Sequence, residues 1–126
     1  HDISLPVSAI ADFVRSTDAQ LAHAIAGVRL VNFGHLGDGN LHYNVQAPVG
    51  MDAADFLRHQ EARVNRIVFD SVQSFGGSIS AEHGVGSLKV DHLAHYKSPV
   101  ALQTMRAIKR ALDPQQLMNP GRVLWS

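Results

Sequence analysis

Cysteine is absent from the 126-residue sequence. Its absence excludes disulfide bonds, thiolate nucleophiles and cysteine-ligated zinc or iron–sulfur centres within these residues. A metal ion held by this chain must therefore rely on histidine, aspartate or glutamate side chains. The sequence contains eight histidines, so imidazole ligands are available.

An excess of either charge is also lacking, because 11 lysine and arginine residues balance 11 aspartate and glutamate residues. Proteins that bind nucleic acid usually carry a basic surface, so we expect no nucleic-acid partner. No apolar run approaches the roughly 20 residues that span a bilayer, and no signal-type segment is present. We therefore expect no transmembrane segment and a cytoplasmic location, or a mitochondrial one in a eukaryote.

The length fits one domain over residues 1–126 but is small for a complete cofactor-dependent enzyme. The chain begins at His1 rather than at a methionine. We therefore expect a piece of a longer protein. The sequence leaves homo-oligomerisation open.

Hydrophobic periodicity in the first half of the chain predicts a strand, a helix and a pair of strands. Residues 2–5 alternate between polar and apolar and stop at a proline, which is typical of a short strand. Apolar residues recur at helical spacing over residues 8–24, which predicts an amphipathic helix ended by glycine. Residues 28–35 and 41–47 flank the turn sequence Gly37-Asp38-Gly39-Asn40 and therefore predict a hairpin.

The second half of the chain predicts two helices separated by one short strand. A long helix over residues 52–75 carries an apolar stripe and ends at two glycines, and a strand over residues 78–81 follows. Residues 98–112 open with Ser-Pro, a common helix start, and predict the last helix. Residues 85–97 lack a clear period and are interpreted as an active-site loop.

This order of elements is β-α-β-β-α-β followed by a C-terminal helix, which is the order of ferredoxin-like α+β folds. In such a fold the helices cover one face of an antiparallel sheet. The other face is left available for a partner or a functional site. We therefore predict an antiparallel sheet with helices on one face.

Two histidines flank the predicted turn. With the turn centred on residues 37–40, Leu36 lies opposite Leu41 and His35 lies opposite His42. Directly opposed residues have Cβ atoms roughly 4.5–5.5 Å apart, from which two imidazoles can bind one ion at about 2 Å. The spacing alone leaves a second interpretation open, in which both histidines are ordinary surface residues of a hairpin.

The alternation of the two hairpin strands divides their side chains between an apolar face and a polar face. The apolar face is predicted to pack under the helices and holds Val28, Leu30, Leu41, Tyr43, Val45 and Ala47. The polar face is predicted to carry the site and holds Arg29, His35, His42, Asn44 and Gln46, with Val31 and Phe33 beside them.

A third ligand is expected, because a catalytic metal site commonly keeps three protein ligands and one open position. Glu82 and His83, at the end of the predicted last strand, are interpreted as one metal ligand and one proton-transfer group. Asp38 is the rival carboxylate, but an aspartate between two glycines commonly forms a turn. Lys89 and Arg29 are candidates to pair with a substrate carboxylate.

Three stretches, in this order along the chain, carry a family resemblance. They are GHLGDGNLH at residues 34–42, GSISAEHGVG at residues 77–86 and LMNPGRVL at residues 117–124. Together they resemble the C-terminal domain of FAD-linked oxidases. That family includes D-lactate dehydrogenase, the flavin subunit of glycolate oxidase and D-2-hydroxyglutarate dehydrogenase.

The resemblance implies that His35, His42 and Glu82 bind a divalent metal, with zinc expected, that His83 is the catalytic base, and that Asn44 lies beside the substrate. It implies oxidation of a D-2-hydroxy acid to the 2-oxo acid, with hydride transfer to FAD. In this family FAD is bound mainly by a larger N-terminal domain, which residues 1–126 do not include. We therefore expect the chain alone to bind metal weakly or not at all and to have no dehydrogenase activity.

Two other classes of function compete with this one. A metal-dependent hydrolase would use the same two histidines and glutamate to activate water, and the absence of a flavin-binding domain upstream would favour it. A non-catalytic ferredoxin-like binding module would use the histidines for no chemistry. Metal-free full-length protein, with activity unchanged by His35→Ala, would favour the binding module.

Overall fold

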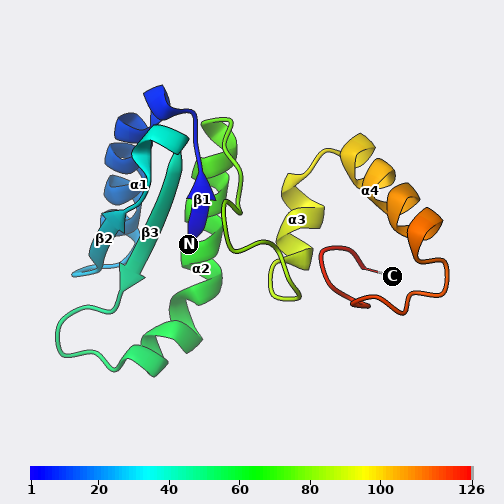
Figure 1. The fold of residues 1–126 in the computed structure, drawn as a ribbon. Helices are drawn as coiled ribbons and strands as arrows, with labels where there is room; N and C mark the ends of the chain where they lie inside the picture. The colour runs from blue at the N-terminus through cyan, green and yellow to red at the C-terminus, as the bar shows by residue number, and fades with distance from the viewer. Residues whose placement is uncertain (126) are drawn as a thin grey trace. The chain divides into compact units, whose positions relative to one another are not determined.

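The computed structural model describes residues 1–125 and divides the chain into two compact units, His1–Glu82 and His83–Ser126 (Figure 1). Within the described residues it contains a three-stranded antiparallel sheet and four α-helices, so the predicted α+β class is confirmed. None of the helices within residues 1–125 has the length and apolar character needed to cross a membrane.

The first unit is built on a sheet with the strand order β1-β3-β2. Strand β1 is Asp2–Ser4, β2 is Arg29–Phe33 and β3 is Asn40–Gln46. Helices α1 (Ile10–Ala24) and α2 (Ala53–Ser74) contact each other and lie on one face of the sheet (Figure 1). The predicted order of the first five elements and the placement of the helices are therefore confirmed.

The core of the first unit fills the space between the sheet and these two helices. The rings of Phe13 on α1 and Tyr43 on β3 meet edge to face with centroids 5.6 Å apart. Side chains that are fully buried in this unit come from β1, β3 and both helices: Ile3, Phe13, Thr17, Leu21, Tyr43, Val68 and Val72. Because the apolar side chains of β3 point into this core, its polar side chains must lie on the opposite face.

The register of the hairpin differs from the predicted one by two residues. Phe33, rather than His35, lies opposite His42, and Arg29 lies opposite Gln46. The prediction that His35 pairs with His42 was therefore wrong. Since a shift of two residues returns every side chain to its original face, the predicted division into two faces is retained.

The shift arises because the connection is longer than a tight turn at residues 37–40. Residues Leu36–Asp38 form the 3₁₀ turn η2, and the His35 carbonyl accepts the N–H groups of Asp38 and Asn40 at 3.0 and 3.2 Å. Gly39 has a φ of +73°, and a Cβ there would lie 2.2 Å from the Leu5 carbonyl oxygen. The glycine is therefore required by both the turn and the contact with the chain after β1.

The predicted strand over residues 78–81 is reduced to a single antiparallel bridge between Ser4 and Ser78. These two serines exchange backbone hydrogen bonds of 3.0 and 2.8 Å. Farther along, the N–H groups of Ala81 and Glu82 donate to the side-chain carboxylate of Asp2. The full strand does not form because a side chain, rather than a neighbouring strand, satisfies these two amides.

The second unit contains helices α3 (Val90–Tyr96) and α4 (Pro99–Leu112) and the segment that follows them. Part of the region interpreted as a loop, residues 85–97, is therefore helical. Helix α4 begins as predicted, with the Ser98 hydroxyl accepting the N–H of Ala101 at 3.2 Å. Within the described residues, the buried apolar side chains of the second unit are Val90, Leu93 and Leu102.

A buried carboxylate, that of Asp113, closes the end of α4. It accepts the N–H groups of Leu117 and Met118 at 2.8 and 2.9 Å and pairs with the ammonium of Lys109. The hydrogen bond from Lys109, followed by those from the two amides, lowers the pKa of the Asp113 carboxyl below its usual value.

Tyr43 is the one phenol in the core of the first unit. It donates a hydrogen bond of 2.5 Å to the Asp18 carboxylate. Burial raises the pKa of Tyr43 well above the usual range, and the contact with Asp18 raises it further. The hydroxyl therefore stays protonated and ties β3 to α1.

The first prediction concerns this tie. Tyr43→Phe should lower the free energy of unfolding by about 1.5–3 kcal/mol, as expected for a hydrogen bond to a charged group. Asp18→Asn keeps an oxygen acceptor, so it should lower the free energy of unfolding by less than Tyr43→Phe does. Urea unfolding followed by circular dichroism measures both changes, and equal stability of Tyr43→Phe and the unsubstituted protein would contradict this role.

The second prediction concerns Asp113. Because its pKa is lower in the folded protein, the carboxylate stabilises the fold above its unfolded pKa, near 3.8, and this contribution is lost as the pH falls through the folded pKa. Asp113→Asn should therefore melt at a lower temperature than the unsubstituted protein at pH 7. The difference in melting temperature between the two proteins should become smaller below pH 3.8. A difference that does not change with pH would contradict the stabilising role of the Asp113 carboxylate.

Candidate functional site

The face of the sheet opposite the helices carries the candidate site. Along β3, Leu41 and Tyr43 are buried, whereas His42 and Asn44 are partly exposed and Gln46 is exposed. The predicted division of the hairpin into a packed face and an open face is thus confirmed by burial. The open face is where β3 can present its polar side chains to a ligand.

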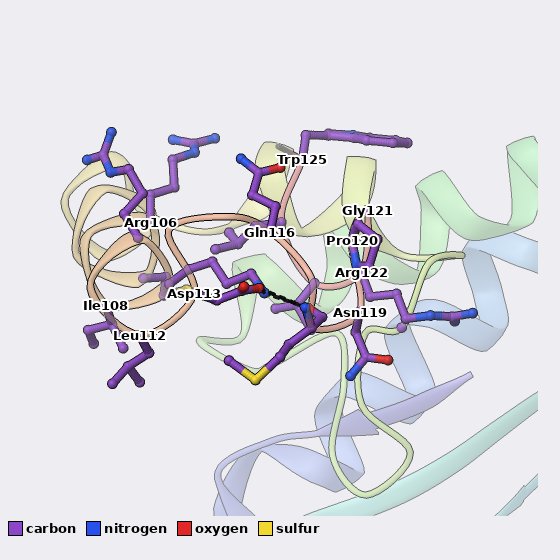
Figure 2. Close-up of a pocket in the computed structure, with 17 residues that line it drawn as sticks. Arg106, Ile108, Leu112, Asp113, Gln116, Asn119, Pro120, Gly121, Arg122 and Trp125 are labelled. Carbon is purple, nitrogen blue, oxygen red and sulfur yellow. Dashed lines mark hydrogen bonds and ion pairs between the residues drawn. The ribbon is translucent and has the colours of Figure 1, made fainter.

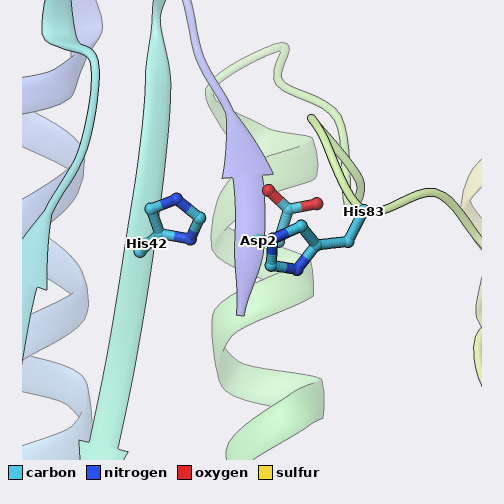
Figure 3. A group of neighbouring side chains, drawn as sticks. All are labelled: Asp2, His42 and His83. Atoms are coloured by element: carbon cyan, nitrogen blue, oxygen red, sulfur yellow. The ribbon is translucent and has the colours of Figure 1, made fainter.

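His42 occupies the middle of a row that runs across all three strands. Asp2 of β1 lies opposite it on one side and Phe33 of β2 on the other. The rings of Phe33 and His42 have centroids 5.0 Å apart and are tilted by 31°. An oxygen of Asp2 and a ring nitrogen of His42 lie within 4.8 Å of each other, and Figure 3 shows these two side chains on their neighbouring strands.

Glu82, at the end of the first unit, lies next to both predicted histidine ligands. Its Oε1 is 3.2 Å from Nδ1 of His35, and its Oε2 is 3.7 Å from Nε2 of His42. The side chain of His42 is 19% exposed, whereas those of His35 and Glu82 are 70% and 46% exposed. The structure therefore places Glu82 beside each of the two predicted histidine ligands, although His35 approaches it from the loop before η2 and not from a strand.

The two separations between Glu82 and the histidines are close to those of two ligands on one metal ion. Two ligands that each lie about 2.0–2.2 Å from a tetrahedral ion are themselves roughly 3.3–3.6 Å apart. The observed separations of 3.2 and 3.7 Å between the Glu82 oxygens and the histidine nitrogens bracket that value. Two imidazoles and a carboxylate are also the donor types that zinc and similar divalent ions accept in catalytic sites.

Asp2 takes part in the site, and sequence reasoning missed it. Its carboxylate is buried, with 6% of the residue exposed, and accepts the N–H groups of Ala81 and Glu82 at 3.1–3.2 Å. The sequence feature that could have pointed to Asp2 is its position as an acidic residue within the predicted strand at residues 2–5. Its role depends on the pairing of β1 with β3, which the local sequence does not reveal.

Asn40 is a second residue that sequence reasoning treated only as part of the turn. It lies at the start of β3, two positions before His42 and therefore on the same face. The residue is 4% exposed, and within residues 1–125 neither polar atom of its side-chain amide has a hydrogen-bond partner. Buried amides are normally satisfied, so a ligand group or a bound water is expected to contact Asn40.

The other predicted site residues lie in different places. Asn44 is two residues beyond His42 on the open face, about 7 Å along β3. Arg29 is on the same face but four residues from Phe33, about 13 Å along β2, and its Nε donates to the Ala47 carbonyl at 2.8 Å. His83 and Lys89 belong to the second unit, His83 as its first residue and Lys89 as the residue before α3.

The second unit has a separate cavity of about 740 Å³ (Figure 2). The second half of α4 and the segment after it line the cavity, with apolar side chains such as Ile108 and Leu112 and basic ones such as Arg106. The resembling stretch at residues 117–124 forms part of its wall, mainly through residues 118–124. None of the predicted metal ligands or substrate contacts lines it.

Comparison with known proteins gives a family and several relatives. The family model described as FAD linked oxidases, C-terminal domain, matches residues 1–123. The chain is 43% identical over 123 residues to a D-2-hydroxyglutarate dehydrogenase of Stutzerimonas stutzeri (strain A1501), covering 98% of this chain and 26% of the relative.

Two further relatives come from other organisms. A D-lactate dehydrogenase of Anaerostipes hadrus is 35% identical over 124 residues, covering 98% of this chain and 25% of the relative. A mitochondrial D-2-hydroxyglutarate dehydrogenase of Bos taurus is 39% identical over 124 residues, covering 98% of this chain and 21% of the relative. The chain thus spans about a quarter of the length of the curated relatives it matches.

Proposed function

The chain belongs to the family of FAD linked oxidase C-terminal domains, and from this membership we propose that it is the substrate- and metal-binding part of a flavin-dependent dehydrogenase. The proposed reaction oxidises a D-2-hydroxy acid to its 2-oxo acid. The position of Glu82 beside both His35 and His42 is the observation that carries the proposal. The names of the relatives, D-2-hydroxyglutarate and D-lactate dehydrogenases, support the substrate class.

In this proposal, Glu82, His35 and His42 hold a divalent metal ion, with zinc as the first candidate. When bound, such an ion would polarise the hydroxyl and carboxylate oxygens of the substrate. The carboxylate of Glu82 offsets part of the charge of the ion, and the partial burial of His42 holds one imidazole in place. The exposed side of the group, where His35 and Glu82 face solvent, leaves room for substrate oxygens.

The proton and the hydride of the substrate have separate destinations in the proposed reaction. His83, which follows Glu82 directly in the sequence, takes the proton of the substrate hydroxyl at a ring nitrogen. That role requires a neutral imidazole. FAD, held mainly by a domain outside residues 1–126, supplies the acceptor for the hydride that leaves the α-carbon.

Substrate contacts are proposed for Asn44, Arg29 and Lys89. Asn44 shares the open face with His42 and offers both a donor and an acceptor. Arg29 is farther along the same face, so it would reach the distal end of a longer substrate rather than the reacting carbon. Lys89 supplies a second basic group from the residue before α3.

The finer fold assignment is also a proposal. The bridge between Ser4 and Ser78 puts the segment after α2 beside β1, giving the order of a ferredoxin-like sheet whose last strand is cut short. We propose a cytoplasmic location in a bacterium and a mitochondrial one in a eukaryote, where the bovine relative is named mitochondrial.

The third prediction tests which carboxylate serves the site. Glu82→Gln in the full-length protein keeps the size of the side chain and removes its charge. It should lower kcat/KM for a D-2-hydroxy acid by about 100-fold or more, which corresponds to about 2.7 kcal/mol of transition-state stabilisation. The loss should be accompanied by weaker binding of zinc, measured by calorimetry.

The matched control is Asp38→Asn, the same acid-to-amide change at the rival carboxylate. Asp38 is exposed in η2 and serves the turn, so its substitution should leave kcat/KM within about threefold of the unsubstituted enzyme. A large loss in Asp38→Asn together with little loss in Glu82→Gln would reverse the assignment. The substrates for this assay are D-2-hydroxyglutarate and D-lactate, with a dye as electron acceptor.

A further inference from the structure

The buried carboxylate of Asp2 contacts the segment that carries Glu82. It lies opposite His42 across β1 and β3, and it accepts the N–H groups of Ala81 and Glu82. One of its oxygens receives both amides at 3.1 Å, and the other receives Glu82 at 3.2 Å. A single side chain thus links the strand partner of His42 to the backbone of Glu82.

This link is needed because the chain at Glu82 is not part of a strand. The paired region of this segment ends at Ser78, four residues before Glu82. Within residues 1–125, no strand continues from that bridge to hold Ala81 and Glu82. Hydrogen bonds to a charged acceptor in a buried place are stronger than neutral ones, so Asp2 can fix this part of the backbone.

We propose that Asp2 is a positioning residue for Glu82, an inference that rests on the proposed function. By accepting the Glu82 N–H, Asp2 fixes the backbone position of Glu82. The Glu82 side chain then reaches His35 with one carboxylate oxygen and His42 with the other. Substituting a residue that hydrogen-bonds to a metal ligand and orients it typically weakens metal binding about 10- to 100-fold. Asp2 acts through the backbone of Glu82 and needs no contact with the substrate.

The variant that tests this role is Asp2→Asn in the full-length protein. An asparagine keeps one oxygen acceptor but turns an amide donor toward a backbone donor, so at least one of the contacts with Ala81 and Glu82 is lost. Zinc binding by calorimetry, well below the unfolding temperature, should weaken about 10- to 100-fold. The peptide covering residues 78–84 should exchange its amide hydrogens about tenfold faster in the metal-free protein.

The matched control is Asp113→Asn. Asp113 is also a buried carboxylate that accepts two consecutive backbone N–H groups, those of Leu117 and Met118, but it belongs to the second unit and makes no hydrogen bond to Ala81 or Glu82 within the described residues. Its substitution should lower stability while leaving zinc affinity and exchange at residues 78–84 unchanged. A purely structural role for Asp2 would make the two variants behave alike.

The outcomes separate this inference from the proposed function. Zinc affinity within twofold of the unsubstituted protein in Asp2→Asn would overturn the positioning role. Weaker zinc binding with unchanged exchange at residues 78–84 would also overturn it, because Asp2 would then act through its charge alone. If the unsubstituted protein binds no zinc, the proposed metal site fails, and the exchange result alone decides whether Asp2 holds Glu82.

Discussion

The antiparallel pairing of β1 with β3 places Asp2 opposite His42, and the candidate site in the first unit is arranged around that pair. On β3, the pairing fixes which side chains face the helices and which face outward. On β1, it brings a buried carboxylate to the segment that carries Glu82. Without this pairing, the two halves of the site would have no fixed relation, because they lie about 40 residues apart in the sequence.

Much of the first unit could be predicted from hydrophobic period alone. Alternation in residues 41–47 correctly separated Leu41 and Tyr43 from His42 and Asn44, because the face of a strand residue depends only on its parity. The helices were predictable for a similar reason, since α2 and α4 combine apolar stripes with side-chain caps at Asp52 and Ser98.

What could not be predicted depends on contacts between distant parts of the chain. The hairpin register is set by the 3₁₀ turn and by Gly39 packing against the Leu5 carbonyl, so a local turn rule placed His35 two positions too far along the ladder. The strand after Ser78 is cut short by the Asp2 carboxylate. His35 and Glu82 nevertheless meet, because both lie in irregular segments at the same edge of the site.

We propose that Glu82 completes a metal site with His35 and His42. Anomalous diffraction from crystals of the full-length protein, collected above and below the absorption edge of zinc, tests it most directly. We predict an anomalous peak bonded to His35, His42 and Glu82 at about 2.0–2.2 Å. An anomalous peak bonded to other residues, or zinc-soaked crystals with no peak between these three side chains, would contradict it.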